Sequence, residues 1–257
     1  MMKRLIVPAL IVLPMLAVTA WAAGPSAQAS TNAAAACKAQ RAQIGETAFA
    51  QAWGTLGRCV TSLARVEQQN LDAARAACTA EQSDPNFAAT HEGKTFAQFY
   101  GSGPSGKNAF ASCVSAKSKA SSKAEGQARP NPARLCRAER TAMTPAVFTQ
   151  TYGGTANAFG KCVSAKARAQ NQNEVAAAST CRTEMADAAA FAQAYGTGAN
   201  AFGKCVSTKA KARTTEQQQA TIKAAKACAA EQKASPAAFK AKYGTFGRCV
   251  SQQRTAD

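Results

Sequence analysis

The sequence is poor in acids, in aromatic residues and above all in histidine. Its 257 residues hold 14 Asp and Glu against 31 Lys and Arg, 7% aromatic residues and a single histidine, His91. With one histidine and no Cys-x-x-Cys motif, the sequence offers neither a repeated His/Cys metal site nor a redox-active cysteine pair. We therefore predict no metal, no cofactor and no catalytic residue, and we read His91 as a solvated loop residue. An enzyme whose site leaves no such pattern stays as an alternative.

Long apolar runs are also scarce, since residues 5–21 form the only one. This run follows Lys3 and Arg4 and ends near the small residues Ala20 and Ala22, as in a cleaved secretory signal peptide. A retained membrane anchor is disfavoured, because the run contains prolines and is short for a span of roughly 20 residues. The sequence thus predicts a signal peptide over 1–23, a flexible mature N-terminus over 24–36, and a secreted or extracytoplasmic location.

Cysteine, by contrast, is abundant, and its 10 copies are spaced as a repeat. Three similar stretches begin at Cys136, Cys181 and Cys228, and two weaker copies begin at Cys37 and Cys78. Each copy contains two cysteines at matching places, so that all of them are used. An even set of cysteines behind a signal peptide is typical of an oxidising compartment. We therefore expect five repeats, each closed by its own disulfide.

Each repeat contains a short helix with recognisable start and stop residues. An aromatic pair recurs at i and i+4, as in Phe148 and Tyr152, which places both rings on one helical face. A glycine follows the second aromatic, where a helix commonly ends in a left-handed residue. An N-cap followed by a proline at the first helical position is indicated at Asp84-Pro85, Thr144-Pro145 and Ser235-Pro236.

Longer helices connect one repeat to the next. Residues 59–78, 162–181 and 205–228 contain neither proline nor glycine, and their terminal cysteines would lie about 29 to 35 Å apart along an α-helix. A disulfide needs Cα atoms within about 7 Å, so the two cysteines of one long helix cannot pair. If consecutive long helices run antiparallel, the end of one lies beside the start of the next. The predicted pairs are Cys37 with Cys59, Cys78 with Cys113, Cys136 with Cys162, Cys181 with Cys205, and Cys228 with Cys249.

The fourth connection, residues 113–136, contains Gly126, Pro130 and Pro132 and is therefore not one unbroken helix. We interpret 126–132 as a hinge between repeats one and two (37–125) and repeats three to five (133–257). A tight bend inside one continuous array is the alternative. The predicted fold class is all-α: an array of five disulfide-closed helical repeats, with long antiparallel helices joined by short capped helices.

An acid recurs three residues after the first cysteine, and Gln40 takes its place in the first repeat. The acids are Glu81, Glu139, Glu184 and Glu231. Repeats three to five carry a base just before the second cysteine, namely Lys161, Lys204 and Arg248. An acid near a helix C-terminus and a base near a helix N-terminus each oppose the helix dipole. We therefore expect each acid to pair with the base of its own repeat, beside the disulfide.

The formal net charge of +17 favours anionic partners. Five bases follow the second cysteine in repeats three and four: Lys166, Arg168, Lys209, Lys211 and Arg213. If the long helices present these bases on one side, they form a basic stripe that contacts an anionic polymer or membrane surface. Two alternatives remain open: bases that only keep the protein soluble, and a cationic protein that binds nucleic acid or attacks membranes. Nucleic acid is the less favoured partner, because the recurring aromatics have the phase of core residues. The sequence does not indicate the oligomeric state of the protein.

The string Asn-Ala-Phe-Gly-Lys-Cys-Val-Ser is complete at 157–164 and 200–207. It resembles a two-cysteine repeat of secreted bacterial proteins whose function is not known, and the resemblance covers most of 37–251. The first repeat, and Ala111-Ser112 in the second, depart from the pattern. The resemblance implies export and repetition, and it brings no catalytic residue and no ligand.

Overall fold

The computed structural model describes residues 24–103, 105–154 and 156–255. The predicted signal peptide, 1–23, lies outside these residues. Within them the chain is helical, without strands, and the predicted all-α repeat array is confirmed. None of the described helices combines the length and the hydropathy that a membrane span needs.

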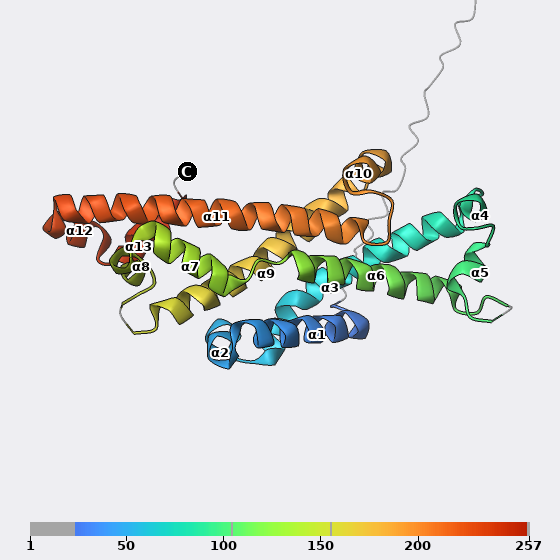
Figure 1. Cartoon of the computed structure of the whole chain (residues 1–257), viewed down its shortest axis with the longest axis horizontal. Coiled ribbons are helices and arrows are strands. Elements are labelled where there is room, and N and C mark those ends of the chain that lie inside the picture. Colours follow the sequence, from blue (N-terminus) through green and yellow to red (C-terminus); the bar gives the residue numbers. More distant parts are fainter. Residues whose placement is uncertain (1–23, 104, 155, 256–257) are drawn as a thin grey trace, which may run out of the picture.

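Helices α1 to α13 follow one another along the chain (Figure 1). The longer ones are α1 (Ala27–Ile44), α3 (Leu56–Gln82), α6 (Ala109–Ala128), α7 (Pro132–Met143), α9 (Ala158–Glu184) and α11 (Ala201–Ala234). The shorter ones are α2 (Glu46–Trp53), α4 (Phe87–Thr90), α5 (Phe96–Tyr100), α8 (Pro145–Thr151), α10 (Ala188–Tyr195), α12 (Pro236–Tyr243) and α13 (Phe246–Thr255).

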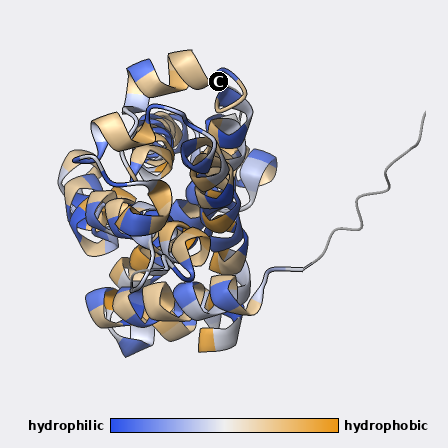
Figure 2. Ribbon diagram, turned by 90° about the vertical axis from the view of Figure 1, so that its right-hand side faces the viewer, coloured by the Kyte–Doolittle hydropathy of each residue, from blue (hydrophilic) through white to orange (hydrophobic). Residues whose placement is uncertain are grey.

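The long helices run back and forth along the long axis of the molecule (Figure 1). Helix α11 lies along one side, α1 and α2 lie on the other, and α3, α6 and α9 lie between them. One end holds α4 and α5, and the opposite end holds α7, α8, α12 and α13. Hydrophobic and hydrophilic residues alternate along these helices (Figure 2), so each helix has one face that can be buried.

The segment 24–36 was expected to be flexible, and most of it is instead the beginning of α1. Ser26 caps this helix through its side chain, and Ala29 and Ala33 are fully buried one turn apart. Helix α1 packs against α3 along this face. The prediction was wrong because the segment holds no large apolar residue. Small alanines still bury a helical face when the neighbouring helix approaches closely.

The disulfides connect the pairs expected from the sequence. They join Cys37 to Cys59, Cys78 to Cys113, Cys136 to Cys162, Cys181 to Cys205, and Cys228 to Cys249. Each ties the start of one helix, namely α3, α6, α9, α11 or α13, to an earlier helix across the short helix or helices between them. These bonds fit an oxidising, extracytoplasmic compartment.

The short helices end as the glycines indicate, with one exception. Gly54, Gly153, Gly196 and Gly244 all have φ between +69° and +86°, whereas Gly101 is extended at −82°. Helices α8 and α12 begin at Pro145 and Pro236 as predicted, but the side chains of Thr144 and Ser235 make no capping hydrogen bond. No helix begins at Asp84-Pro85, because the insertion in the second repeat forms a turn there, and α5 is instead capped by Thr95.

Residues 129–131 separate helix α6 from helix α7, and they lie inside the segment interpreted as a hinge. The helices on either side of these residues pack together, since α3 contacts α9 and α6 contacts α11. A Cβ atom added at Gly203 of α11 would lie 2.5 Å from the carbonyl oxygen of Ser121 of α6. Glycine therefore allows these backbones to touch. The arrangement matches the alternative of a bend inside one continuous array, and it closes the array into a bundle.

Candidate functional site

Each repeat contains a polar cluster beside its disulfide. We call this cluster the staple site; it consists of the residue three after the first cysteine, the second aromatic of the short helix, and the residue four after the second cysteine. In the third repeat, Glu139 is fully buried and pairs with Lys166, and the Tyr152 hydroxyl donates to the same carboxylate. The equivalent trios in the second and fourth repeats are Glu81 with Tyr100 and Lys117, and Glu184 with Tyr195 and Lys209.

The acid of the staple site does not pair with the base just before the second cysteine, as the sequence had suggested. Lys161 instead donates to the carbonyl oxygen of Gly153, 3.1 Å from its Nζ, and Lys204 and Arg248 are exposed. The reason is helical phase. A residue four after the cysteine lies on the same face as the disulfide, whereas the preceding residue is rotated by about 100° toward solvent.

The first and fifth repeats vary the staple site in a correlated way. In the first repeat, Gln40 takes the place of the acid and Leu63 takes the place of the lysine. The second aromatic is Trp53, whose Nε1 donates to Oε1 of Gln40 at 3.2 Å. The repeat that has no acid at the first position therefore also has no base at the third. In the fifth, Lys242 of the short helix supplies the cation, 2.9 Å from Glu231. The staple site is therefore neutral overall in every repeat.

This pairing removes part of the predicted basic stripe. Lys166 is buried against Glu139, and Lys209 lies 2.8 Å from Glu184, so neither is available to an external anion. Arg168, Lys211 and Arg213 remain exposed. The two lysines face inward because they share the helix face of the second cysteine. The segments of α9 and α11 that follow the second cysteine thus do not form the continuous stripe that the sequence suggested.

Few acids are exposed on the surface, because several lie in staple sites or in the interior of the bundle. Glu67, Glu125, Glu139 and Glu174 are buried, and Glu81, Glu184 and Glu231 are partly buried in staple sites. Among the described residues, the exposed acids are Glu46, Asp84, Glu92, Asp187 and Glu216. Most lysines and arginines remain exposed. The outer surface is therefore more basic than the net charge alone indicates.

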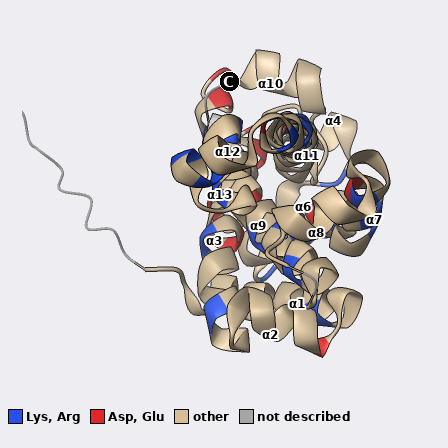
Figure 3. Cartoon of the chain, turned by 90° about the vertical axis from the view of Figure 1, so that its left-hand side faces the viewer, with Lys and Arg blue, Asp and Glu red and all other residues tan. Residues whose placement is uncertain are grey.

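Lysines and arginines outnumber acids at the end formed by α7, α8, α12 and α13, which faces the viewer in Figure 3. Residues 130–165 and 220–255 contain only two acids, Glu139 and Glu231, and both belong to staple sites. We call the exposed bases here the cationic end; they are Arg134, Arg137, Arg140, Lys226, Lys233, Lys240 and Arg248. One hydrophobic core joins the third and fifth repeats beneath them, so these side chains project from a rigid support.

A second polar cluster lies in the middle of the bundle. Arg129, at the end of α6, makes two bonds to Glu174 of α9, from Nε at 2.7 Å and from Nη2 at 2.5 Å. Glu67 of α3 accepts from Ser122 at 2.6 Å, and Glu125 accepts from Asn70 at 3.1 Å. The centre thus holds three buried carboxylates for one guanidinium. We call Glu67, Glu125, Glu174 and Arg129 the central cluster.

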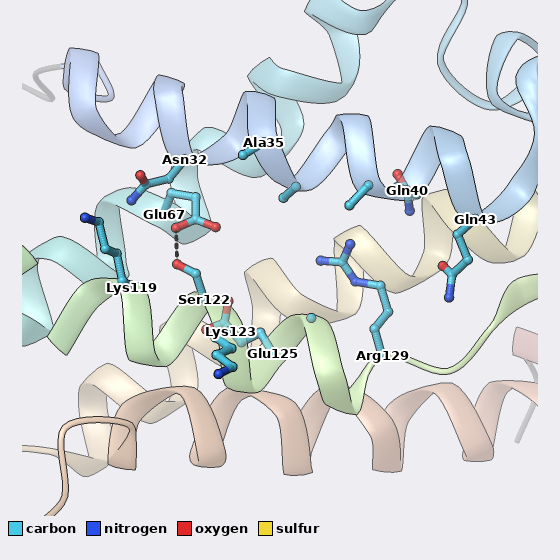
Figure 4. Close-up of a pocket in the computed structure, with 13 residues that line it drawn as sticks. Asn32, Ala35, Gln40, Gln43, Glu67, Lys119, Ser122, Lys123, Glu125 and Arg129 are labelled. Atoms are coloured by element: carbon cyan, nitrogen blue, oxygen red, sulfur yellow. Dashed lines mark hydrogen bonds between the residues drawn. The ribbon is translucent and has the colours of Figure 1, made fainter. Parts of the chain in front are cut away.

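The surroundings of the central cluster disfavour ionised carboxylates. Burial raises the pKa of Glu67, and hydrogen bonds from Ser122 and Asn70 only partly oppose this effect. Burial, together with the carboxylates of Glu174 and Glu67, raises the pKa of Glu125 well above its ordinary value. Glu67 and Glu125 also line a cleft of about 490 Å³ between α1, α3 and α6 (Figure 4).

These raised pKa values predict that the protein becomes more stable on mild acidification. A carboxyl with a raised folded-state pKa stabilises the fold fully below its ordinary value of 4.5. That contribution is lost as pH rises through the folded-state pKa. We expect the free energy of unfolding, measured by urea denaturation, to increase as pH falls from about 8 to about 5.5. Glu125→Gln should flatten this dependence and stabilise the protein at the higher pH.

Glu216→Gln is the matched control, because Glu216 is an exposed acid of α11. It should keep the wild-type pH dependence. An unchanged slope in Glu125→Gln, or a wild-type protein that loses stability over this range, would contradict the interpretation. The measurement stays above pH 5 because the pKa of Glu231 is lowered by hydrogen bonds from Lys242 and Tyr243, so its contribution is lost at lower pH.

The sequence did carry a signal for the central cluster. Glu125 and Glu174 each follow the second cysteine of their repeat by twelve residues, on the face that also carries the staple-site lysine. Arg129 was not recognisable, since it lies in the irregular segment next to Pro130.

His91 is partly buried, not solvated as predicted, and its ring stacks on that of Phe87 with 3.8 Å between the ring centres. The described residues contain no group of three or more His, Cys, Asp or Glu arranged to hold a metal ion.

Comparison of this chain with protein families, with curated proteins and with solved structures finds no match.

Proposed function

We propose that this protein is a non-enzymatic, extracytoplasmic binding protein whose cationic end contacts anionic polysaccharides of the cell envelope or its surroundings. The observation that carries the proposal is that Glu139 and Glu231 are both paired with a lysine inside staple sites. Both acids of residues 130–165 and 220–255 are used in staple sites, so the exposed bases of these two segments have no exposed acid among them. Such a patch attracts polyanions and concentrates them at the surface.

Arg134 and Arg137 are the most suitable contacts within the cationic end. They lie three residues apart on α7, so they are neighbours on one exposed helical face. Guanidinium groups bind carboxylate and sulfate or phosphate oxygens through paired hydrogen bonds. Arg140 lies on the same helix, with its guanidinium 5.7 Å from the centre of the Phe159 ring, which restrains its position. This arrangement favours a repeated anionic group along an extended polymer.

A polysaccharide is favoured over nucleic acid and over a lipid surface by the absence of suitable apolar side chains. Binding of single-stranded nucleic acid uses aromatic side chains on which bases stack. Here Tyr152 and Tyr243 are turned into staple sites. The exposed large hydrophobic residue among the described ones is Phe99, which lies at the opposite end of the molecule. The cationic end therefore offers charge without a stacking platform or a membrane-inserting residue.

Binding to polygalacturonate, an anionic polysaccharide, tests the proposal. We expect saturable binding that weakens steeply with salt, because exposed charges are screened beyond about 10 Å at 0.1 M. Arg134→Gln/Arg137→Gln should raise the dissociation constant by about thirtyfold at low salt, since each base near an anionic surface contributes on the order of 1 kcal/mol. Titration by fluorescence anisotropy at several salt concentrations measures both effects.

Arg65→Gln/Lys107→Gln is the matched control, because it removes the same charge from exposed side chains outside the cationic end. It should weaken binding far less. Equal weakening by both double variants would show attraction by net charge alone and would overturn the assignment to the cationic end. Tighter binding to single-stranded DNA or to phosphatidylglycerol vesicles than to the polysaccharide, at equal salt, would overturn the choice of partner.

A further inference from the structure

The central cluster is short of positive charge. Arg129 neutralises Glu174 through two bonds, and its side chain is only 10% exposed. Glu67 and Glu125 receive hydrogen bonds from Ser122 and Asn70 but form no ion pair within the described part of the chain. Burial raises the pKa of both carboxyls, and a cation beside them would stabilise their ionised form. A cationic group in the cleft would supply that charge.

The cleft also contains polar atoms that lack hydrogen-bond partners. Oε1 of Glu125 is one, on a residue that is 4% exposed, and Nδ2 of Asn32 is another. The first accepts and the second can only donate. Both residues line the cleft. Native proteins satisfy nearly all buried polar atoms, so an unsatisfied acceptor and donor on two lining residues favour a ligand that carries both kinds of group. Both atoms are buried, so such a ligand would reach them after a small shift of the lining side chains.

The charged side chains are spread along the cleft in a definite order (Figure 4). Lys119 and Asn32 lie at one end, Glu67 lies next to them with its carboxylate under α1, and Arg129 lies toward the other end. Ala35, Ala36 and Ala39 of α1 form an apolar wall opposite these groups. A cation, an anion and an apolar body would thus each find a complementary surface within the same cleft.

We propose that this cleft binds a small zwitterion of the amino-acid type, either a free aliphatic amino acid or a short peptide with a free amino group. Its ammonium group lies between Glu67 and Glu125, its carboxylate meets Lys119 and the Asn32 amide, and its aliphatic part packs on the alanines of α1. The volume of about 490 Å³ is within the usual range for small-molecule sites. This site is separate from the cationic end and does not depend on the function proposed for it.

A metal ion would not satisfy the cleft in the same way. Calcium needs six to eight oxygen ligands and magnesium a nearly octahedral set. The described residues contain no group of three or more candidate metal ligands. Moreover, Glu67 and Glu125 are already fixed by hydrogen bonds from Ser122 and Asn70. A primary ammonium group needs only two or three acceptors and carries its own apolar attachment, which suits the alanine wall.

Isothermal titration of the full-length protein with three matched compounds tests the proposal. L-leucine carries both charges, 3-methylbutylamine lacks the carboxylate, and N-acetyl-L-leucine lacks the ammonium. We expect L-leucine or L-leucyl-L-alanine to bind with one-to-one stoichiometry, 3-methylbutylamine to bind more weakly, and N-acetyl-L-leucine to bind weakest. Comparing leucine with leucyl-alanine distinguishes a free amino acid from a peptide.

Two variants assign the charges to their partners. Glu67→Gln should weaken L-leucine and 3-methylbutylamine by about tenfold or more, as expected for loss of a charged hydrogen bond, and leave N-acetyl-L-leucine unchanged. Lys119→Gln should weaken L-leucine and leave 3-methylbutylamine unchanged. Glu216→Gln is the control for a lost acid outside the cleft and should change nothing. The melting temperature of each variant should match that of the wild type, which shows that weaker binding is not caused by unfolding.

The proposal is overturned if neither zwitterion binds at millimolar concentration. It is also overturned if Glu67→Gln and Glu216→Gln behave alike, or if N-acetyl-L-leucine binds as tightly as L-leucine. Failure here leaves polysaccharide binding by Arg134 and Arg137 intact, because the two experiments use different ligands and different side chains.

Discussion

Reduction of the disulfides is expected to unfold the protein at room temperature. Each bond closes a loop of 21 to 35 residues, which corresponds to roughly 3 to 4 kcal/mol of loop-closure entropy per bond. Five such contributions together amount to about 15 to 20 kcal/mol, which exceeds the whole stability of a typical domain, about 5 to 15 kcal/mol. The core cannot replace them, because much of it is alanine. Circular dichroism at 222 nm after treatment with dithiothreitol, followed by thiol alkylation, measures the loss of helix.

The separate repeats give this experiment an internal comparison. Cys228→Ala/Cys249→Ala opens only the terminal repeat, whereas Cys136→Ala/Cys162→Ala opens a repeat whose helices pack against α11 and α2 as well. Both should lower the free energy of unfolding by about 3 kcal/mol or more. A fully reduced protein that kept its helical signal and a cooperative unfolding transition would show that packing alone supports the fold.

The disulfides and long helices followed from the sequence because their signals repeat: the cysteine pair occurs in five repeats, and a connection without proline or glycine occurs three times. A glycine after the second aromatic ends the short helix with a positive φ in four of the five repeats, and a stretch without proline or glycine between cysteines is helical. The early start of α1 was missed since Ala29 and Ala33 are buried only by contact with α3. Such burial depends on how the helices pack, which residue types do not reveal.

The charge pairs were harder to predict for the same reason. Distance along the chain made Lys161 the natural partner of Glu139, but helical phase selected Lys166. The central cluster brings residues of α3, α6 and α9 together across the bundle. Its members share no sequence neighbourhood, so only the repeated spacing of Glu125 and Glu174 pointed to it. The candidate ligand cleft therefore emerged from the folded structure alone.

Glu139→Ala is expected to be strongly destabilising, although it removes a single side chain. Glu139 is 0% exposed, and its loss leaves the Lys166 ammonium and the Tyr152 hydroxyl buried without their acceptor. Breaking a buried ion pair from one side typically costs about 3 to 5 kcal/mol, because the remaining charge is uncompensated. Urea denaturation of the oxidised protein measures the change. The equivalent Glu231→Ala should cost much less, since the Lys242 ammonium is 61% exposed and stays hydrated, and only the Tyr243 hydroxyl loses a partly buried acceptor.

The first repeat shows how the loss should be reversed. There, Gln40, Trp53 and Leu63 occupy the three positions without any charge, and the same type of disulfide and short helix is retained. Transferring this set as Glu139→Gln/Tyr152→Trp/Lys166→Leu should therefore recover most of the stability lost in Glu139→Ala, because acid and base are removed together. If Glu139→Ala cost no more than Glu231→Ala, or if the triple variant were as unstable as Glu139→Ala, the staple site would not be a coupled unit. The covariation inside one chain would then need another cause.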